Sequence, residues 1–144
     1  MTIIKAYNKN TTKFTLAILT GLIIFIGMGL KQAKQTNDWV APKSADQLKN
    51  PYKDNITTTA EGKKLYMKFC KICHGGKGRG DGLAGINLKP RPKDFTSEKV
   101  QKQTDGAIFW KLTNGKPPMA AYEKILKEEQ RWKLVNYIRE LGKN

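Results

Sequence analysis

The sequence is poor in the side chains that most often bind metal ions. Its 144 residues contain two cysteines and a single histidine. A structural zinc site normally takes four ligands from cysteine, histidine and carboxylates, so zinc here would require an unusual carboxylate ligand. The chain also lacks internal repeats and any convincing alternation of apolar and polar residues, which argues against repeat architectures and β-sheets. Its length suits one small domain with some accessory sequence.

Acidic residues are scarce as well. The chain has 12 aspartates and glutamates against 27 lysines and arginines, for a formal net charge of +15. A positive charge of this size favours nucleic acid, an anionic membrane surface or an acidic protein as partner. Residues 56–144 carry 19 lysines and arginines against 9 acidic residues, so most of the excess belongs to the C-terminal part of the chain.

An uncharged stretch, FTLAILTGLIIFIGMGL, occupies residues 14–30 and has lysines on both sides. It is longer than the roughly 7–15 residues of a signal-peptide core and matches the short end of the roughly 17–25 residues of a membrane span. We therefore predict that residues 1–30 are an N-terminal anchor in the inner membrane. The alternative is a cleaved signal peptide with a weak cleavage site at residues 27–29. Either way the rest of the chain is expected to be exported to the periplasm, tethered or soluble.

The polar residues 31–55, interrupted by Pro42 and Pro51, predict a linker. Trp39 is unusual in a free tether and is expected to pack on the domain that follows. We predict one domain over residues 56–144.

This domain is predicted to be all-α. Thr58 and Glu61 have the spacing of a capping box, and no proline follows until residue 90, so a helix is expected to begin there. Residues 104–115 predict a short helix between a threonine cap and a glycine stop. Residues 127–142 predict a longer helix with an apolar stripe and a C-terminal glycine.

Cys70, Cys73 and His74 are predicted to project from one side of the last turn of the first helix, since they are spaced i, i+3 and i+4. A thioredoxin-like cysteine pair would follow a strand in a βαβ unit, which is absent here. A phosphate-binding P-loop is excluded because Gly76-Lys77 is followed by glycine instead of serine or threonine. The pattern Cys-x-x-Cys-His in an exported chain is instead typical of c-type haem attachment.

The spacing has a chemical reason. Two thiols one turn apart reach the two vinyl groups on one edge of a porphyrin, and the next residue directs its imidazole at the iron. Attachment consumes both cysteines, so no disulfide is expected. We therefore predict one covalent haem c, bound through Cys70 and Cys73, with His74 as an iron ligand.

A second protein ligand to the iron must be something other than histidine, because His74 is the only one. Met1 and Met28 lie in the N-terminal segment, and Met67 is too close to the attachment motif to cross the ring. Met119, in the sequence NGKPPMAAY, is left as the predicted sixth ligand. Its alternative role is that of a core residue, as for most methionines.

From about residue 56 to residue 144, the chain resembles a class I (monohaem) cytochrome c. The stretch CHGGKGRGDGLAGINLKPRPKDF is similar to small bacterial cytochromes and to haem c subunits of membrane respiratory complexes, including cbb3-type oxidases and alternative complex III. Ala120 departs from the family, in which proline commonly follows the ligand methionine. The residues that match the family positions, two of them before the motif and two in the last helix, are Gly62, Tyr66, Cys70, Cys73, His74, Met119, Leu134 and Tyr137.

The resemblance implies the small class I cytochrome c fold around one haem. It also implies a proline carbonyl that accepts a hydrogen bond from the histidine Nδ1–H, for which Pro90 is the first candidate and Pro92 the second. Trp110 can donate its indole N–H to a haem propionate or serve as a plain core aromatic, and both roles are open.

An iron with ligands on both faces has no open position for a substrate. We therefore expect a one-electron carrier of a respiratory chain and not an enzyme, with acidic-faced redox proteins as partners and no nucleic acid. The alternative is a fixed monohaem subunit of a larger membrane oxidoreductase. A third class, a haem that reacts with gases or peroxide, requires that Met119 is not bound.

Overall fold

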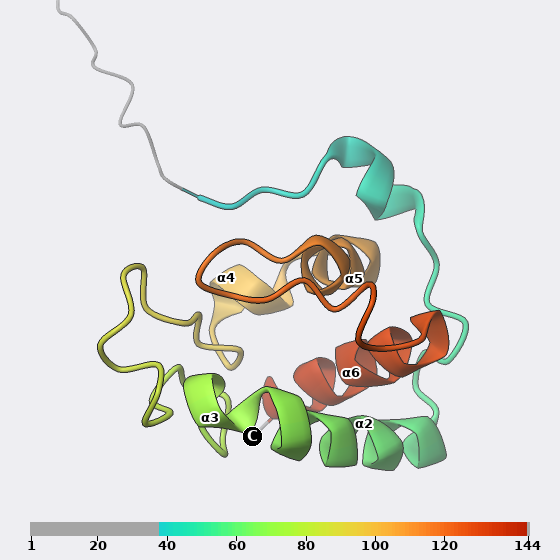
Figure 1. Ribbon diagram of the computed structural model, residues 1–144. Helices are drawn as coiled ribbons and strands as arrows, with labels where there is room; N and C mark the ends of the chain where they lie inside the picture. The colour runs from blue at the N-terminus through green and yellow to red at the C-terminus, as the bar shows by residue number, and fades with distance from the viewer. Residues whose placement is uncertain (1–37, 144) are drawn as a thin grey trace, which may run out of the picture. The chain divides into compact units, whose positions relative to one another are not determined.

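The computed structural model of the chain describes residues 38–143, and Trp39–Asn144 forms one compact unit (Figure 1). This part of the chain contains helices and no strand, which confirms the all-α prediction for the residues described. The elements are η1 (Lys43–Gln47), α2 (Ile56–Phe69), α3 (Lys71–His74), α4 (Glu98–Gln101), α5 (Asp105–Asn114) and α6 (Glu128–Leu141).

The predicted anchor, residues 1–30, lies outside the described residues. Within residues 38–143, no helix is both long enough and apolar enough to cross a membrane.

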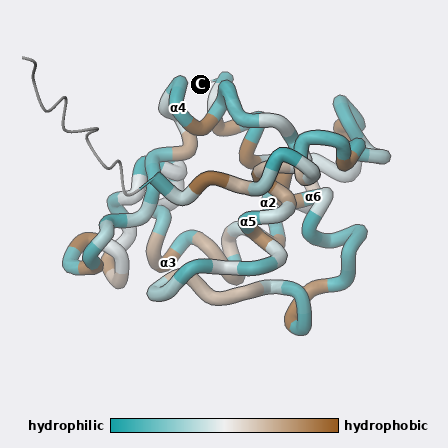
Figure 2. The backbone as a smooth tube through the Cα atoms, turned by 90° about the horizontal axis from the view of Figure 1, so that it is seen from above, coloured by the Kyte–Doolittle hydropathy of each residue, from teal (hydrophilic) through white to brown (hydrophobic). Residues whose placement is uncertain are grey.

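Helices α2 and α6 pack closely and form the centre of the domain. A Cβ atom at Gly62 would lie 2.0 Å from the carbonyl oxygen of Lys133, so only glycine allows the two backbones to approach this far. The rings of Tyr66 and Tyr137 meet at a centroid distance of 5.1 Å, and Leu134 is fully buried. Gly62, Tyr66 and Tyr137, which match family positions in the sequence, therefore lie at the contact between these two helices. Seen from above in Figure 2, α2, α5 and α6 overlap at the centre of the trace.

The start of α2 differs from the capping-box prediction. The helix begins at Ile56, and the side chain of Asn55 accepts a hydrogen bond from the Thr58 N–H at 3.1 Å. Thr58 is buried, and its hydroxyl accepts a 2.9 Å bond from the Asn136 side chain on α6. The hydroxyl thus joins two helices instead of capping one, which the local pattern does not reveal.

The predicted ends of the helix over residues 104–115 and the predicted start of the last helix agree with the structure. The hydroxyl of Thr104 accepts from the Ala107 N–H at 3.0 Å at the start of α5, and Gly115, with φ 61°, follows its end. At the start of α6 the Lys127 N–H donates to the Gln130 side chain at 2.9 Å, so this turn is held although lysine is a poor cap.

Residues 39–55, which we call the strap, pack on the domain instead of forming a linker. The ring of Trp39 lies 6.3 Å from that of Trp110, as expected for Trp39. A Cβ atom at Gly106 would lie 1.9 Å from the Ala45 carbonyl oxygen, so the strap backbone lies directly on α5. Figure 1 shows η1 on the side of α5 that faces away from α2, and the rest of the strap running down to the start of α2. The linker prediction is therefore corrected for these residues.

Candidate haem attachment site

The two cysteines and the histidine lie in a separate turn after α2. Helix α2 ends at Phe69, and the N–H groups of Cys73 and His74 both donate to the Cys70 carbonyl, at 3.2 and 2.9 Å. The thiols are thus one turn apart, as the spacing predicts, on α3 and its cap. Both cysteines are free.

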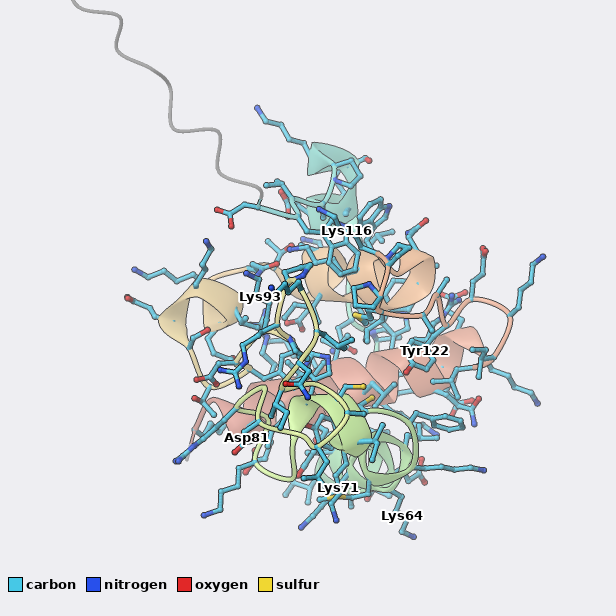
Figure 3. All side chains as sticks on the ribbon, turned by 60° about the vertical axis from the view of Figure 1, so that its left-hand side comes forward. Lys64, Lys71, Asp81, Lys93, Lys116 and Tyr122 are labelled. Atoms are coloured by element: carbon cyan, nitrogen blue, oxygen red, sulfur yellow. The ribbon has the colours of Figure 1, made fainter. Side chains whose placement is uncertain are left out.

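The surroundings of the two thiols differ. Cys70 is buried and Cys73 is half-buried. Burial, together with the neighbouring Cys73, raises the pKa of Cys70 to about 12, so its thiol is protonated at neutral pH. Burial and the thiols of Cys70 and Cys73 raise the pKa of the Tyr122 hydroxyl to about 12. This hydroxyl donates to the Phe69 carbonyl at 3.0 Å, which ties the loop after α5 to the end of α2 (Figure 3).

The imidazole of His74 is buried and held by one hydrogen bond. Its Nδ1 lies 3.2 Å from the Lys93 carbonyl oxygen. Because a carbonyl only accepts, Nδ1 carries the proton and Nε2 keeps its lone pair. Burial lowers the pKa of His74, which favours the neutral ring. This is the tautomer that a metal ligand needs.

The acceptor is not the predicted one. Neither Pro90 nor Pro92 provides the carbonyl for His74; Lys93 does. A Cβ atom at Gly80 would lie 2.4 Å from the Pro92 carbonyl oxygen, so that carbonyl faces the glycine loop. The carbonyl of the following residue, Lys93, is the one that turns toward the imidazole. The prediction for Pro90 is therefore wrong, because the proline pattern marks the segment but not the peptide unit that faces the ring.

Phe95 stacks on the His74 imidazole. The two ring centroids are 4.2 Å apart and the planes differ by 13°. Sequence reasoning missed both Phe95 and Lys93. The available signal was the motif KPRPKDF, which continues three residues past the second proline.

The glycine-rich loop after His74 closes the end of α3. The N–H of Gly80 donates to the His74 carbonyl at 2.9 Å, and that of Gly82 donates to the Cys73 carbonyl at 3.2 Å. A Cβ atom at Gly82 would lie 2.5 Å from the Ile72 carbonyl oxygen, so the approach requires glycine. These N–H groups bind the chain itself, which agrees with the exclusion of a phosphate-binding loop.

Met119 sits in a tight turn after α5. Its N–H donates to the Lys116 carbonyl at 2.8 Å, and the Lys116 N–H donates to the Met119 carbonyl at 3.1 Å. The side chain is half-buried and packs against the core cluster that includes Cys70 and Leu112. Met67, by contrast, is 38% exposed on α2.

Trp110 is half-buried on α5 and packs against Trp39. Within residues 38–143 its indole N–H has no hydrogen bond. The donor role toward a propionate therefore stays a prediction beside the packing role.

These residues fit a covalently bound haem. Two free thiols lie one turn apart, a neutral imidazole keeps its Nε2 lone pair, and a thioether packs on the cluster that contains one of the thiols. Residues 59–142 match the family model for cytochrome c. The chain belongs to the cytochrome c family. With its one Cys-x-x-Cys-His motif it is a monohaem cytochrome c, in which Cys70 and Cys73 match the positions that attach haem c covalently.

Two solved structures are similar to this cytochrome c. One is the Kuenenia stuttgartiensis reducing HAO-like protein complex Kustc0457/Kustc0458, with 28% identity and a TM-score of 0.57 over 65% of this chain and 49% of that one. This chain thus spans about half the length of that relative. The other is the KustC0563 c-type cytochrome, with 30% identity and a TM-score of 0.48 over 56% of this chain and 95% of that one. A comparison with curated proteins finds no match.

Proposed function

We propose that this cytochrome c is a one-electron carrier with His/Met ligation and no enzymatic activity of its own. The proposal is supported by the buried, neutral His74 and by Met119, which packs on the core cluster that contains Cys70. Bound haem supplies an iron that cycles between Fe(III) and Fe(II). Ligands on both faces would leave no position for a substrate.

The residues of the chain would tune this cofactor in three ways. The Lys93 carbonyl orients His74 and increases the basicity of its Nε2. The Met119 thioether is a soft, neutral ligand that favours Fe(II), so we expect a higher potential than for bis-histidine haem. Trp110 would hold a propionate if its free indole N–H faces one, and otherwise serves as packing for Trp39.

The experiment that tests the ligation is an optical and redox titration of the purified holoprotein. We expect the absorption band of a Met–Fe(III) bond and no binding of carbon monoxide to the reduced protein. Binding of carbon monoxide to the wild type would instead support a haem that reacts with gases or peroxide.

We further propose that the carrier docks on acidic-faced redox proteins. Lys64 lies on α2, Lys71 lies on α3, and Lys116 follows the end of α5 (Figure 3). The excess of basic over acidic residues in residues 56–144, 19 against 9, creates a positive field that raises the association rate with an acidic partner. The exposed basic residues near the attachment motif and the Met119 turn are Lys63, Lys64, Lys68, Lys71, Lys77, Arg79 and Lys116.

We also propose a place in a respiratory chain, with the protein anchored in the inner membrane through the uncharged residues 14–30 and the haem domain in the periplasm. N-terminal sequencing of the native protein tests this proposal. A start at residue 1 or 2 is expected for an anchor. A start near residue 30 would show a cleaved signal peptide and a soluble periplasmic carrier.

A fixed subunit of a larger membrane oxidoreductase is the second candidate. The packed strap favours it, because a simple tether does not need a docked segment of this length. A solved neighbour described as part of a protein complex also supports it. Co-purification with large membrane proteins after mild detergent extraction would favour the subunit over the shuttle.

A further inference from the structure

We propose that Phe95 is a positioning residue for the His74 imidazole and that it acts together with the Lys93 carbonyl. We call these two groups the imidazole clamp. The proposal rests on the proposed function, in which His74 is an iron ligand.

The clamp holds the imidazole on its edge and on its face. The hydrogen bond from Nδ1 to Lys93 fixes the direction of one ring edge. The nearly parallel Phe95 ring, 4.2 Å away, covers one face and blocks rotation about the Cβ–Cγ bond of His74. A hydrogen bond alone leaves the ring free to tilt around the N–H···O axis. The stacked ring removes that freedom.

Phe95 is itself anchored at its backbone. Its N–H donates to the Gly78 carbonyl at 2.7 Å, within the loop that follows His74. Its carbonyl accepts from the Gln101 side chain at 2.6 Å, and the same amide donates to the Ile138 carbonyl on α6 at 3.0 Å. The ring is therefore tied both to the attachment loop and to α6.

The half-buried Phe95 side chain has the glycine loop and the Tyr66 ring as neighbours. A Cβ atom at Gly78 would lie 3.3 Å from the Phe95 Cβ, so the backbone of the loop lies close to the base of the side chain. The Tyr66 ring meets the Phe95 ring edge-on at 6.2 Å. The Phe95 ring thus links α2 and the glycine loop to the His74 imidazole, so the positions of these elements fix the position of the imidazole.

The molecule offers a matched control for stacking. Phe109 stacks on Trp132 with a centroid distance of 3.9 Å and planes 14° apart, nearly the geometry of Phe95 on His74. Its partner is a core aromatic instead of the imidazole. Replacing Phe109 therefore removes a comparable stack without touching the clamp.

The test compares four holoproteins, the wild type, Phe95→Leu, Phe95→Tyr and Phe109→Leu. Proton NMR of the oxidised protein reports the orientation of the axial imidazole through the hyperfine shifts of the haem methyl groups. Deuterium exchange of the His74 Nδ1–H reports the strength of its hydrogen bond. Thermal unfolding of each variant measures the general loss of stability.

For Phe95→Leu we expect a changed order or spread of the methyl shifts and Nδ1–H exchange about 5-fold faster, the change that corresponds to the net strength of one hydrogen bond. Phe95→Tyr keeps the flat ring and is expected to retain both properties. Phe109→Leu is expected to lower the unfolding temperature while it retains both. If Phe95→Leu does not yield a folded holoprotein, Phe95→Met, which keeps volume but lacks a flat face, is measured instead.

Wild-type shifts and exchange in Phe95→Leu or Phe95→Met would overturn the proposal and leave Phe95 as ordinary core packing. The same changes in Phe95→Tyr or in Phe109→Leu would also overturn it, since the effect would then not depend on the ring over His74. A wild type without a Met–iron bond would contradict the proposed ligation but not the clamp, because the clamp acts on His74 alone.

Discussion

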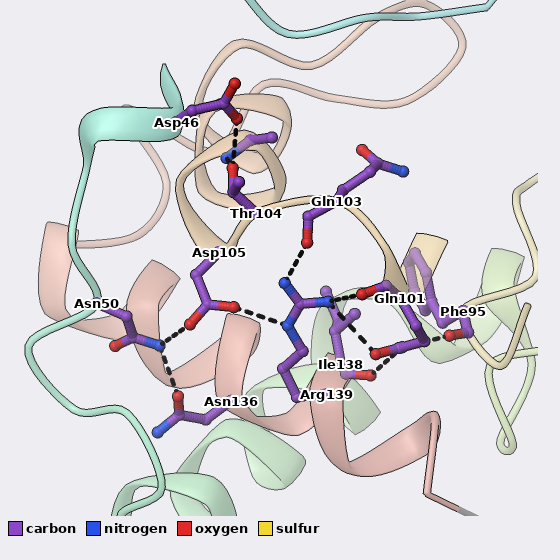
Figure 4. Close-up of polar contacts among 11 residues, drawn as sticks. Asp46, Asn50, Phe95, Gln101, Gln103, Thr104, Asp105, Asn136, Ile138 and Arg139 are labelled. Carbon is purple, nitrogen blue, oxygen red and sulfur yellow. Dashed lines mark hydrogen bonds and ion pairs between the residues drawn. The ribbon is translucent and has the colours of Figure 1, made fainter. Parts of the chain in front are cut away.

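Two regions of the domain are held together in different ways. The strap side is the strap with the residues of α5 and α6 that bind it, and the attachment side is α3 with the loop that follows His74. On the strap side, side chains bind side chains across elements that are far apart in sequence. Asn50 donates to Asn136 at 2.7 Å and to Asp105 at 3.2 Å, and Arg139 donates to Asp105 at 2.7 Å (Figure 4). On the attachment side, the loop after His74 is held mainly by its own backbone hydrogen bonds.

Arg139 shows what the strap side requires. Its guanidinium is partly buried and donates to the carbonyls of Gln101 at 2.8 Å and Gln103 at 2.5 Å, besides its ion pair with Asp105. A charge in such a place is stable only while its partners are present. We therefore expect the domain to lose stability when any one residue of this hydrogen-bond network is replaced.

On the attachment side both thiols are free. Because backbone groups close the loop, the thiols and the imidazole are not needed to hold it. The basic side chains around it point outward, as Lys64 and Lys71 do in Figure 3. The comparison thus predicts that substitutions on the attachment side change the cofactor and partner binding, whereas those on the strap side change stability.

The largest effect is expected when both attachment thiols are removed. Cys70→Ala with Cys73→Ala should yield a chain without covalent haem and with little helix, because so small a domain is marginal without its cofactor. Mass spectrometry and circular dichroism measure the two changes. On the strap side, Trp39→Ala should retain the haem mass. Extraction of haem from the wild type by acid–acetone would contradict covalent attachment.

Met119→Ala should open one face of the iron. We expect carbon monoxide binding to rise from none to one per haem and the reduction potential to fall, since the soft ligand is lost. Met67→Ala, at an exposed position of α2, is the control and should change neither. If the spectrum and the potential of Met119→Ala equal those of the wild type, another residue is the ligand, and Lys116 is the first to test.

Asp105→Ala should destabilise the strap side without changing the haem spectrum. It leaves Arg139 and Asn50 without a shared acceptor, and we expect a loss of about 2–3 kcal/mol in the free energy of unfolding. The exposed pair of Lys102 and Glu98 is the comparison, since Glu98→Ala should cost less than about 1 kcal/mol. Denaturant unfolding of the holoproteins measures both. Equal losses would mean that the network adds nothing beyond a surface ion pair.

Trp39→Ala should have a smaller effect. It removes the contact with Trp110, worth about 0.5–1.5 kcal/mol for an aromatic pair, together with some buried apolar area. Val40→Ala, at a position that is 74% exposed, should leave the unfolding free energy unchanged. Similar values for the two variants would show that the start of the strap is not docked in solution.

Charge reversal is expected to have the smallest effect per residue, since an exposed pair contributes about 0–1 kcal/mol. Lys64→Glu with Lys71→Glu should slow electron transfer to the natural partner severalfold, whereas Lys43→Glu with Lys49→Glu on the strap should not. The rate should also fall with salt, because the screening length shrinks from about 10 Å at 0.1 M to about 3 Å at 1 M. A salt-independent rate together with co-purification would favour the fixed subunit.

Some features of this protein could be predicted from the sequence because they depend on neighbouring residues. The attachment chemistry needs two thiols and an imidazole within one turn, so Cys70, Cys73 and His74 specify it by spacing alone. The ends of α5 follow from Thr104 and Gly115 for the same reason, since a cap acts within a few residues of itself.

Other features were decided only by the tertiary structure. The acceptor for His74 is 19 residues away and depends on which peptide unit of the segment turns toward the ring. Phe95 reaches the imidazole because the glycine loop draws its backbone in, and the strap docks because Gly106 lets Ala45 approach. Such contacts depend on how closely distant backbones can pack, and no local pattern of residues specifies that distance.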